Sequence, residues 1–170
     1  MRKQRMPVTV NKTKTSPDSG FAPEFIEAVR QVFEEKIVFN QLLGLKLIHL
    51  QPERVSVRLD MRPELIGAYS HKRLHGGVIS ASLDAVGGLV VMTAIGARHL
   101  DESLDQLMHR FTRVATIDMR VDYLRPGIGE NFEIRAEVMR LGSRVASTRM
   151  EFLGADGTLL STGAGAYIVA

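Results

Sequence analysis

The sequence contains no cysteine among its 170 residues. This absence excludes a disulfide framework, a thiolate nucleophile and a zinc site with sulfur ligands. It is compatible with the reducing cytoplasm, which is the location that we expect. Internal repeats and low-complexity tracts are also missing, and 45% of the residues are hydrophobic. The chain is therefore expected to fold around one ordinary globular core.

Acidic residues are missing from the start of the chain, where five basic residues precede Asp18. The same segment lacks the apolar stretch of a signal peptide, so we expect no export signal. Its basic charges are not interleaved with aromatic residues, which favours a solvated tail over a surface for nucleic acid or acidic lipid. We therefore predict a basic, disordered tail over residues 1–22 and no nucleic-acid partner.

A membrane-spanning segment is the third feature that the sequence lacks. Residues 76–97 form the longest weakly polar stretch, and they approach the roughly 20 apolar residues that a span needs. Glycines stand at positions 76, 77, 87 and 88, however, and Asp84 lies near the centre. Because a carboxylate at that depth is strongly unfavourable in lipid, the segment predicts the buried helix of a globular core.

The spacing of apolar residues elsewhere predicts a single domain over residues 23–170. Before Lys36 they recur at three- and four-residue intervals, as on one face of a helix. After position 115 they alternate with polar residues, as on one face of a sheet. The elements expected are helices at 23–36 and 39–43, a hairpin of strands at 45–51 and 53–61, a loop to His75, the buried helix at 78–95, a short exposed helix within 98–114, and four strands at 115–124, 131–141, 144–153 and 158–169.

The order of these elements predicts the class α+β. Short turn sequences separate the last four strands, which is typical of an antiparallel meander. A twisted antiparallel sheet can wrap around one apolar helix and bury it, and this arrangement would explain a helix without a polar face.

Asp84 is the candidate for chemistry because it is the one acid in this apolar helix. The residues on its stripe are Gly77, Ala81, Asp84, Gly88 and Val91. Small neighbours allow either close packing against another backbone or space for a ligand. Gly76 and Gly77 stand where the helix begins, and the first N–H groups of a helix have no partner within it. Such N–H groups can polarise a carbonyl while a carboxylate activates water, which suits ester or thioester hydrolysis.

The distance between the glycines and the acid limits how a single helix could form such a site. Gly77 and Asp84 on one helix lie about 10 Å apart at roughly 1.5 Å per residue, so one substrate carbon could hardly touch both. A site shared by two chains resolves the difficulty, which makes a homodimer part of the hypothesis. In the alternative, structural interpretation, Asp84 pairs with a group in an interface, the glycines allow tight packing, and His75 is a hydrogen-bonded structural residue.

Two motifs carry a resemblance to a known family. LHGGVISASLDAVGGL places an acid nine residues after a histidine, and TIDMRVDYLRPGIGE contains Asp-Tyr-Leu-Arg-Pro at the end of a strand. Over approximately residues 24–169 the chain resembles the PaaI-type hotdog-fold acyl-CoA thioesterases, and within them the bacterial YigI-like branch. The resemblance implies a hotdog fold, an antiparallel sheet wrapped around a central buried helix, and a homodimer or dimer of dimers.

The resemblance also implies an activity and its residues. The expected enzyme hydrolyses an acyl-CoA to a carboxylic acid and CoA, with no metal or other cofactor. Asp84 is then the general base or nucleophile, the N–H of Gly77 from the partner chain polarises the thioester carbonyl, and His75 shapes that loop, with Gly76 beside the substrate. The residues expected near the CoA moiety, where a guanidinium could meet a phosphate, are Gly142, Ser143 and Arg144, with Arg125 as a weaker candidate.

One position departs from the family pattern. Relatives often carry a Gly-Asn pair ahead of the histidine, whereas this chain has Gly67-Ala68. Tyr69, Ser70 or His71 could replace the missing amide. The departure leaves open a second function, in which the protein binds acyl-CoA without cleaving it. The related hotdog hydratases are a third possibility, but their acid and histidine motif has no match here.

Overall fold

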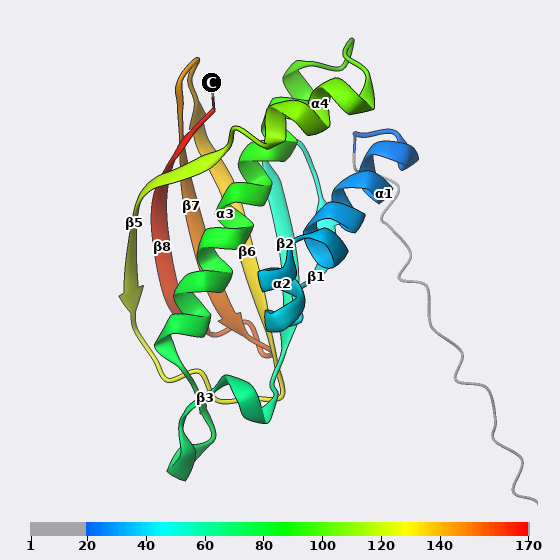
Figure 1. The fold of residues 1–170 in the computed structure, drawn as a ribbon. Coiled ribbons are helices and arrows are strands. Elements are labelled where there is room, and N and C mark those ends of the chain that lie inside the picture. The colour runs from blue at the N-terminus through cyan, green and yellow to red at the C-terminus, as the bar shows by residue number, and fades with distance from the viewer. Residues whose placement is uncertain (1–19, 170) are drawn as a thin grey trace, which may run out of the picture.

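The computed structural model describes residues 20–169, in which a long helix lies across one face of an antiparallel sheet (Figure 1). The predicted tail falls outside the described residues as far as residue 19. The elements are α1 (Pro23–Gln31), the π-helical η1 (Val32–Lys36), α2 (Val38–Leu43), β1 (Lys46–Leu50), β2 (Arg54–Asp60), η2 (Pro63–Leu65), β3 (Ile66–Ala68), η3 (Tyr69–His71), β4 (Arg73–Leu74), α3 (Gly76–Arg98), α4 (Leu104–Phe111), β5 (Ala115–Tyr123), β6 (Asn131–Leu141), β7 (Val145–Gly154) and β8 (Leu159–Ile168).

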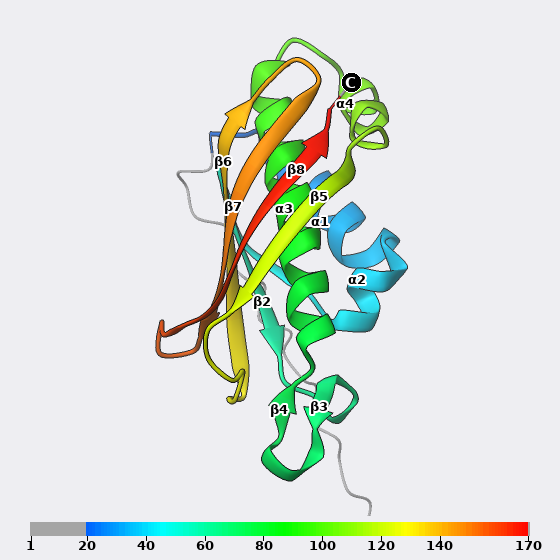
Figure 2. The same ribbon diagram turned by 90° about the vertical axis from the view of Figure 1, so that its left-hand side faces the viewer.

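The sheet has six strands in the order β1-β2-β6-β7-β8-β5, and each neighbouring pair is antiparallel. The predicted hairpin of β1 and β2 is confirmed, and so is the succession β6-β7-β8. The predicted four-strand meander is wrong at its first strand, because β5 pairs with β8 while β6 pairs with β2. The connection of residues 124–130 carries the chain across the end of the sheet instead of turning back (Figure 1). β5 is therefore an edge strand of the described chain (Figure 2).

The long helix α3 forms the centre of the core, as predicted. Leu83 and Val86 are buried, and they belong to one core with inward-facing sheet residues such as Ile134. A second stripe of α3, which includes Ala81 and Asp84, is only half-buried. A single chain therefore covers the sheet-facing side of the helix and leaves the side that carries the acid partly open.

By length and composition alone, α3 could also cross a membrane, and it is the one helix of residues 20–169 with that property. In the structure 61% of its most apolar window is buried inside the fold. This burial agrees with the prediction, made from the central Asp84, that the segment is a core helix and not a membrane span.

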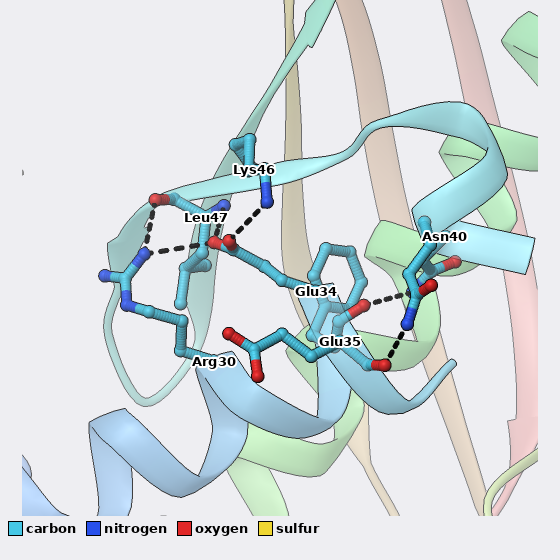
Figure 3. A network of polar contacts seen from close by, with 8 residues as sticks. Arg30, Glu34, Glu35, Asn40, Lys46 and Leu47 are labelled. Carbon is cyan, nitrogen blue, oxygen red and sulfur yellow. Dashed lines mark hydrogen bonds and ion pairs between the residues drawn. The ribbon is translucent and has the colours of Figure 1, made fainter. Parts of the chain in front are cut away.

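The predicted first helix, over residues 23–36, is divided into α1 and η1. The predicted second helix, over residues 39–43, corresponds to α2, which ends at Gly44 as expected, with φ +77° in the left-handed region. Glu34 of η1 holds these pieces on β1 (Figure 3). Its carboxylate accepts the backbone N–H of Leu47 at 2.8 Å and pairs with Arg30 at 3.1 Å and Lys46 at 3.0 Å. Since Glu34 is itself mostly buried, this network gives the N-terminal helices a fixed position beside the sheet.

Two further segments differ from the expectation. The short helix after α3 begins with a capping box between Ser103 and Gln106. This helix, α4, was expected to be exposed, but Leu107 and Phe111 are buried, so one of its faces packs on the core. The segment before His75, expected as a loop, contains a small hairpin of β3 and β4 that projects beyond the start of α3 (Figure 2).

Candidate active site

The start of α3 presents backbone N–H groups next to His75. This residue is the N-cap of the helix, and its Nδ1 accepts the N–H of Gly77 at 2.9 Å. The N–H of Gly77, predicted to polarise the carbonyl, is thus already bonded within its own chain. The N–H of Gly76 has no acceptor among residues 20–169. The first turn therefore offers a free donor at Gly76, at the positive end of a 23-residue helix.

A basic hollow lies on one side of this first turn. It has a volume of about 450 Å³, and its lining includes Arg73, His75, Gly76, Tyr123 and Arg125. Arg125 donates to the carbonyl of Leu159 at 2.8 Å, which fixes the guanidinium at the rim. The structure thus brings the predicted Arg125 to the same place as Gly76 and adds a second arginine, Arg73. Two guanidinium groups beside a helix N-terminus favour an anionic ligand such as a phosphate.

An apolar hollow lies on another side of the same turn. It has a volume of about 360 Å³ and includes His75 and Gly77 in its wall. Its other lining residues come from α2, from η2, from the start of β3 and from the first turn of α3, and they include Phe39, Leu42, Leu65, Ile66 and Val78. The start of α3 therefore separates a basic hollow from an apolar hollow, and His75 is common to both.

Asp84 is held by two hydroxyl groups from distant strands. Thr116 on β5 donates from Oγ1 to Oδ1 of Asp84 at 2.8 Å, and Tyr167 on β8 approaches the same oxygen at 3.4 Å. The Tyr167 hydroxyl also lies 3.3 Å from the backbone carbonyl of Asp84. The other carboxylate oxygen, Oδ2, has no hydrogen-bond partner within residues 20–169. One oxygen is thus anchored while the other is free to accept a proton.

The large side chain of Tyr167 is buried, and it fits only because some of the residues packed against it are small. A Cβ at Gly87 would lie 2.1 Å from the Tyr167 hydroxyl, and one at Gly165 would lie 2.9 Å from its ring. Glycine at these positions therefore makes room for the ring. Burial raises the pKa of Tyr167 well above its usual value, and the adjacent Asp84 carboxylate raises it further. Tyr167 consequently stays protonated and can act as a donor.

Asp84 and the start of α3 do not meet within one chain. Eight residues separate Gly76 from Asp84, which corresponds to about 12 Å along the helix. Neither the basic nor the apolar hollow includes Asp84 in its lining. The distance problem seen in the sequence therefore persists in the structure.

The turn of residues 142–144 lies at the opposite end of α3. The guanidinium of Arg98, the last residue of α3, donates to the carbonyl of Leu141 at 2.7 Å. Gly142 closes a tight turn, because its N–H donates to the carbonyl of Val145 at 2.9 Å. Within one chain, Gly142, Ser143 and Arg144 are thus not brought together with Gly76 and Arg125.

A larger hollow of about 710 Å³ lies on the outer face of the sheet. Its lining contains alternating charges that pair with one another, such as Glu137 with Arg54 and Arg149. The sheet separates it from α3, so it does not belong to the site described here. No cluster of three or more potential metal ligands occurs in the part of the chain that the structure describes.

Sequence reasoning missed Thr116, Tyr167 and Arg73. Thr116 is a polar residue in an alternating strand, and Tyr167 is a large side chain in a strand rich in glycine and alanine. The small residue Gly165 beside Tyr167 was a usable signal, because glycine in a strand indicates that something large is packed against it. Arg73 precedes the His-Gly-Gly motif by two residues and carried no separate signal.

Comparison with known proteins places this geometry in a family. The model of the Thioesterase superfamily matches residues 71–161, more than half of the chain, and the match includes His75, Gly76, Asp84 and Thr116. The chain is 34% identical over 148 residues to the medium/long-chain acyl-CoA thioesterase YigI of Escherichia coli, and the match covers 87% of this chain and 96% of that protein.

Solved structures agree with this assignment. A crystal structure of a Shewanella oneidensis protein related to the thioesterase superfamily is 41% identical, with a TM-score of 0.81 and coverage of 86% of this chain and 96% of that one. Zebrafish thioesterase superfamily member 2 is 16% identical, with a TM-score of 0.67 over 85% of this chain and 96% of that one, and supports the fold alone. The predicted hotdog fold and the predicted class of enzyme, a thioester hydrolase, are confirmed, and the chain belongs to the thioesterase superfamily.

Proposed function

We propose that this protein is an acyl-CoA thioesterase in which Asp84 activates water and a backbone N–H at the start of α3 polarises the thioester carbonyl. The observation that carries the proposal is the state of the Asp84 carboxylate. Its Oδ1 is anchored by the hydroxyls of Thr116 and Tyr167 while its Oδ2 is free. A fixed carboxylate with one free oxygen suits a general base.

The reaction follows from these groups. Oδ2 of Asp84 accepts a proton from a water molecule, and the water oxygen forms a bond to the thioester carbon. The carbonyl oxygen becomes an oxyanion, which a helix N-terminal N–H stabilises. The carbon–sulfur bond then breaks and the proton held by Asp84 passes to the leaving sulfur, so that the carboxylic acid and CoA leave and the carboxylate is restored. The free N–H of Gly76 favours this residue as the donor over Gly77, whose N–H is bonded to His75.

The distance of about 12 Å between Gly76 and Asp84 on one helix supports a site built from two chains. The half-buried stripe of α3 around Asp84 lies next to the edge strand β5, whose Ile117 is exposed. An unpaired strand edge beside an apolar helix face is suited to pairing with a second copy about a two-fold axis. We therefore propose a homodimer, alone or as a dimer of dimers, which light scattering of the purified protein would measure.

The basic hollow supports a site for the CoA moiety beside the reacting carbonyl. Arg73 and Arg125 would meet its phosphates there. The turn with Gly142, Ser143 and Arg144 remains a candidate for CoA contact only through a partner chain, because it lies at the other end of its own α3. The cytoplasm remains the predicted location, which cell fractionation would test.

A thiol-release assay with acyl-CoA tests the activity. Asp84→Ala is expected to fold and to lose most of the turnover, and full turnover in this variant would reject the assigned role. Tight acyl-CoA binding by the wild type without thiol release would instead favour the binding protein that the Ala68 departure left open.

A matched pair of variants at Gly76 tests the donor. Gly76→Pro removes the N–H at the first helical position, where proline is tolerated, and His75 before it is already extended. Gly76→Ala keeps the N–H, and the atoms nearest to its Cβ would be those of the Tyr123 side chain, at 3.5 Å or more. Proline is expected to lower kcat by about 10²- to 10³-fold, whereas alanine is expected to retain most of it. Equal activities of the two variants would exclude Gly76 as the donor.

Co-expression of the two inactive variants tests the shared site. A heterodimer of an Asp84→Asn chain and a Gly76→Pro chain contains one intact pair if Asp84 and Gly76 act across the interface. Partial recovery of activity on mixing is therefore expected. A mixture as inactive as its parents, with heterodimers shown by tagged purification, would reject the two-chain site.

A further inference from the structure

The exposed face of α2 is unusually apolar. Val38, Phe39 and Leu42 are 75%, 53% and 64% exposed. They occupy positions i, i+1 and i+4, so they share one face of the helix. Contiguous apolar surface of this kind on a folded chain marks a binding surface more often than chance exposure does.

The position of α2 is fixed by one buried and one exposed polar contact. The Asn40 side chain, which is buried, donates to the carbonyl of Phe33 at 3.0 Å. Arg62 donates to the carbonyl of Leu42 at the end of α2. These contacts join α2 to η1 and to Arg62, and the Glu34 network in turn holds η1 on β1 (Figure 3). The apolar face is therefore a preformed surface.

This face is continuous with the apolar hollow at the start of α3. Phe39 and Leu42 form part of its wall, and His75 and Gly77 form another part. Among residues 20–169, only Glu64 and His75 contribute titratable side chains to the lining. Because the described part of the lining offers no arginine or lysine, it suits an uncharged apolar ligand and disfavours a phosphate.

We propose that the apolar hollow and the outer face of α2 form the site for the acyl chain, with Phe39 and Leu42 as residues that determine chain-length preference. The inference rests on the proposed function, because a thioester carbonyl at the first turn of α3 has two substituents that must leave in different directions. The basic hollow suits the CoA side. The acyl group, covalently joined to the same carbonyl, then enters the hollow that shares His75 and Gly77 with this turn.

The geometry predicts a preference for longer chains. A short acyl group ends inside the hollow, whereas a longer one reaches Phe39 and Leu42 and covers surface that is otherwise in water. Each methylene group buried there is expected to raise kcat/KM by roughly fourfold, until the chain passes the end of α2.

Truncation at α2 tests the site. The measurement is kcat/KM for butanoyl-, octanoyl-, dodecanoyl- and hexadecanoyl-CoA with Phe39→Ala, Leu42→Ala and the double variant. The ratio of kcat/KM for dodecanoyl-CoA to that for butanoyl-CoA is expected to fall about tenfold in the single variants. Leu100→Ala is the matched control, because it also removes an exposed leucine (72% exposed) but lies after the far end of α3. Its ratio is expected to equal that of the wild type.

Each other outcome has a defined meaning. An unchanged ratio in Phe39→Ala and Leu42→Ala, or an equal loss for all chain lengths, overturns the acyl site. A smaller assembly of these variants in light scattering, with an unchanged ratio, shows instead that a second copy covers α2. If the wild type releases no thiol from any acyl-CoA, the proposed function fails, and the acyl site is then tested by calorimetric titration with the uncleavable thioether S-dodecyl-CoA. Weaker binding to Leu42→Ala than to Leu100→Ala supports the site, and equal binding overturns it.

Discussion

Replacement of Gly87 by alanine is expected to disturb both the stability of the core and the activity. The added Cβ would lie 2.1 Å from the Tyr167 hydroxyl and 2.6 Å from the sulfur of Met150. Overpacking in a core costs about 1–3 kcal/mol, and displacement of the Tyr167 hydroxyl from Asp84 costs about 1 kcal/mol more. Alanine gains about 1 kcal/mol in helix propensity. The net expectation is a loss of about 2 kcal/mol in the free energy of unfolding.

Removal of the Tyr167 hydroxyl tests whether the clash with this group causes the loss of stability in Gly87→Ala. Tyr167→Phe removes the hydroxyl that the new methyl group would meet, so the double variant should be more stable than the sum of the two single effects predicts. Contacting residues typically show couplings of about 0.5–3 kcal/mol in such cycles. Urea unfolding followed by far-UV circular dichroism is suitable, because the chain contains no tryptophan.

The neighbouring Gly88 provides the matched control. A Cβ there would meet only the ring of Tyr167, at 4.0 Å, so Gly88→Ala should gain roughly 1 kcal/mol from helix propensity. Light scattering must show the same association state for both variants, since Gly88 is on the half-buried stripe of α3. Equal stability of Gly87→Ala and the wild type, or strict additivity with Tyr167→Phe, would refute the packing argument.

Three further predictions concern the site. Thr116→Val should lower kcat about tenfold with KM within about twofold, because the hydroxyl positions Asp84 and does not bind CoA; steady-state kinetics would measure this, and a change in KM alone would contradict it. Arg73→Ala should instead raise KM for acyl-CoA and leave kcat nearly unchanged, which the same assay would show. The raised pKa of Tyr167 means that the folded chain holds the phenolic proton more tightly than the unfolded chain. The free energy of unfolding should therefore fall as pH rises above about 10, by up to about 1.4 kcal/mol per pH unit, and this component should be missing from Tyr167→Phe in urea titrations at several alkaline pH values.

Local patterns were sufficient for most of the secondary structure. The alternation in β5 and the helical spacing in α1 are properties of neighbouring residues, and the backbone responds to them locally. Strand pairing depends on more distant contacts, which is why the placement of β5 beside β6 was wrong. The same alternating strand would satisfy either neighbour, and only the packing of both faces of the sheet distinguishes them.

In the candidate site, too, some features follow from local sequence and others depend on contacts between distant residues. The His-Gly-Gly motif and Asp84 are close in sequence, and the proposal of a site shared by two chains already followed from the rise of a helix. Thr116 and Tyr167 are 32 and 83 residues from Asp84 in the chain, so no local spacing could connect them. Likewise, only the folded chain shows that the N–H of Gly77 is bonded to His75 while that of Gly76 is free.

By itself the sequence determined the α+β class, the core helix with its single acid, and the superfamily, because these depend on periodicity and on a compact motif. The tertiary structure alone decided which strand lies at the sheet edge, which hydroxyls hold the carboxylate, and which hollow lies on each side of α3. The physical reason is that burial and hydrogen bonding join residues by distance in space, and separation along the chain carries little information about that distance.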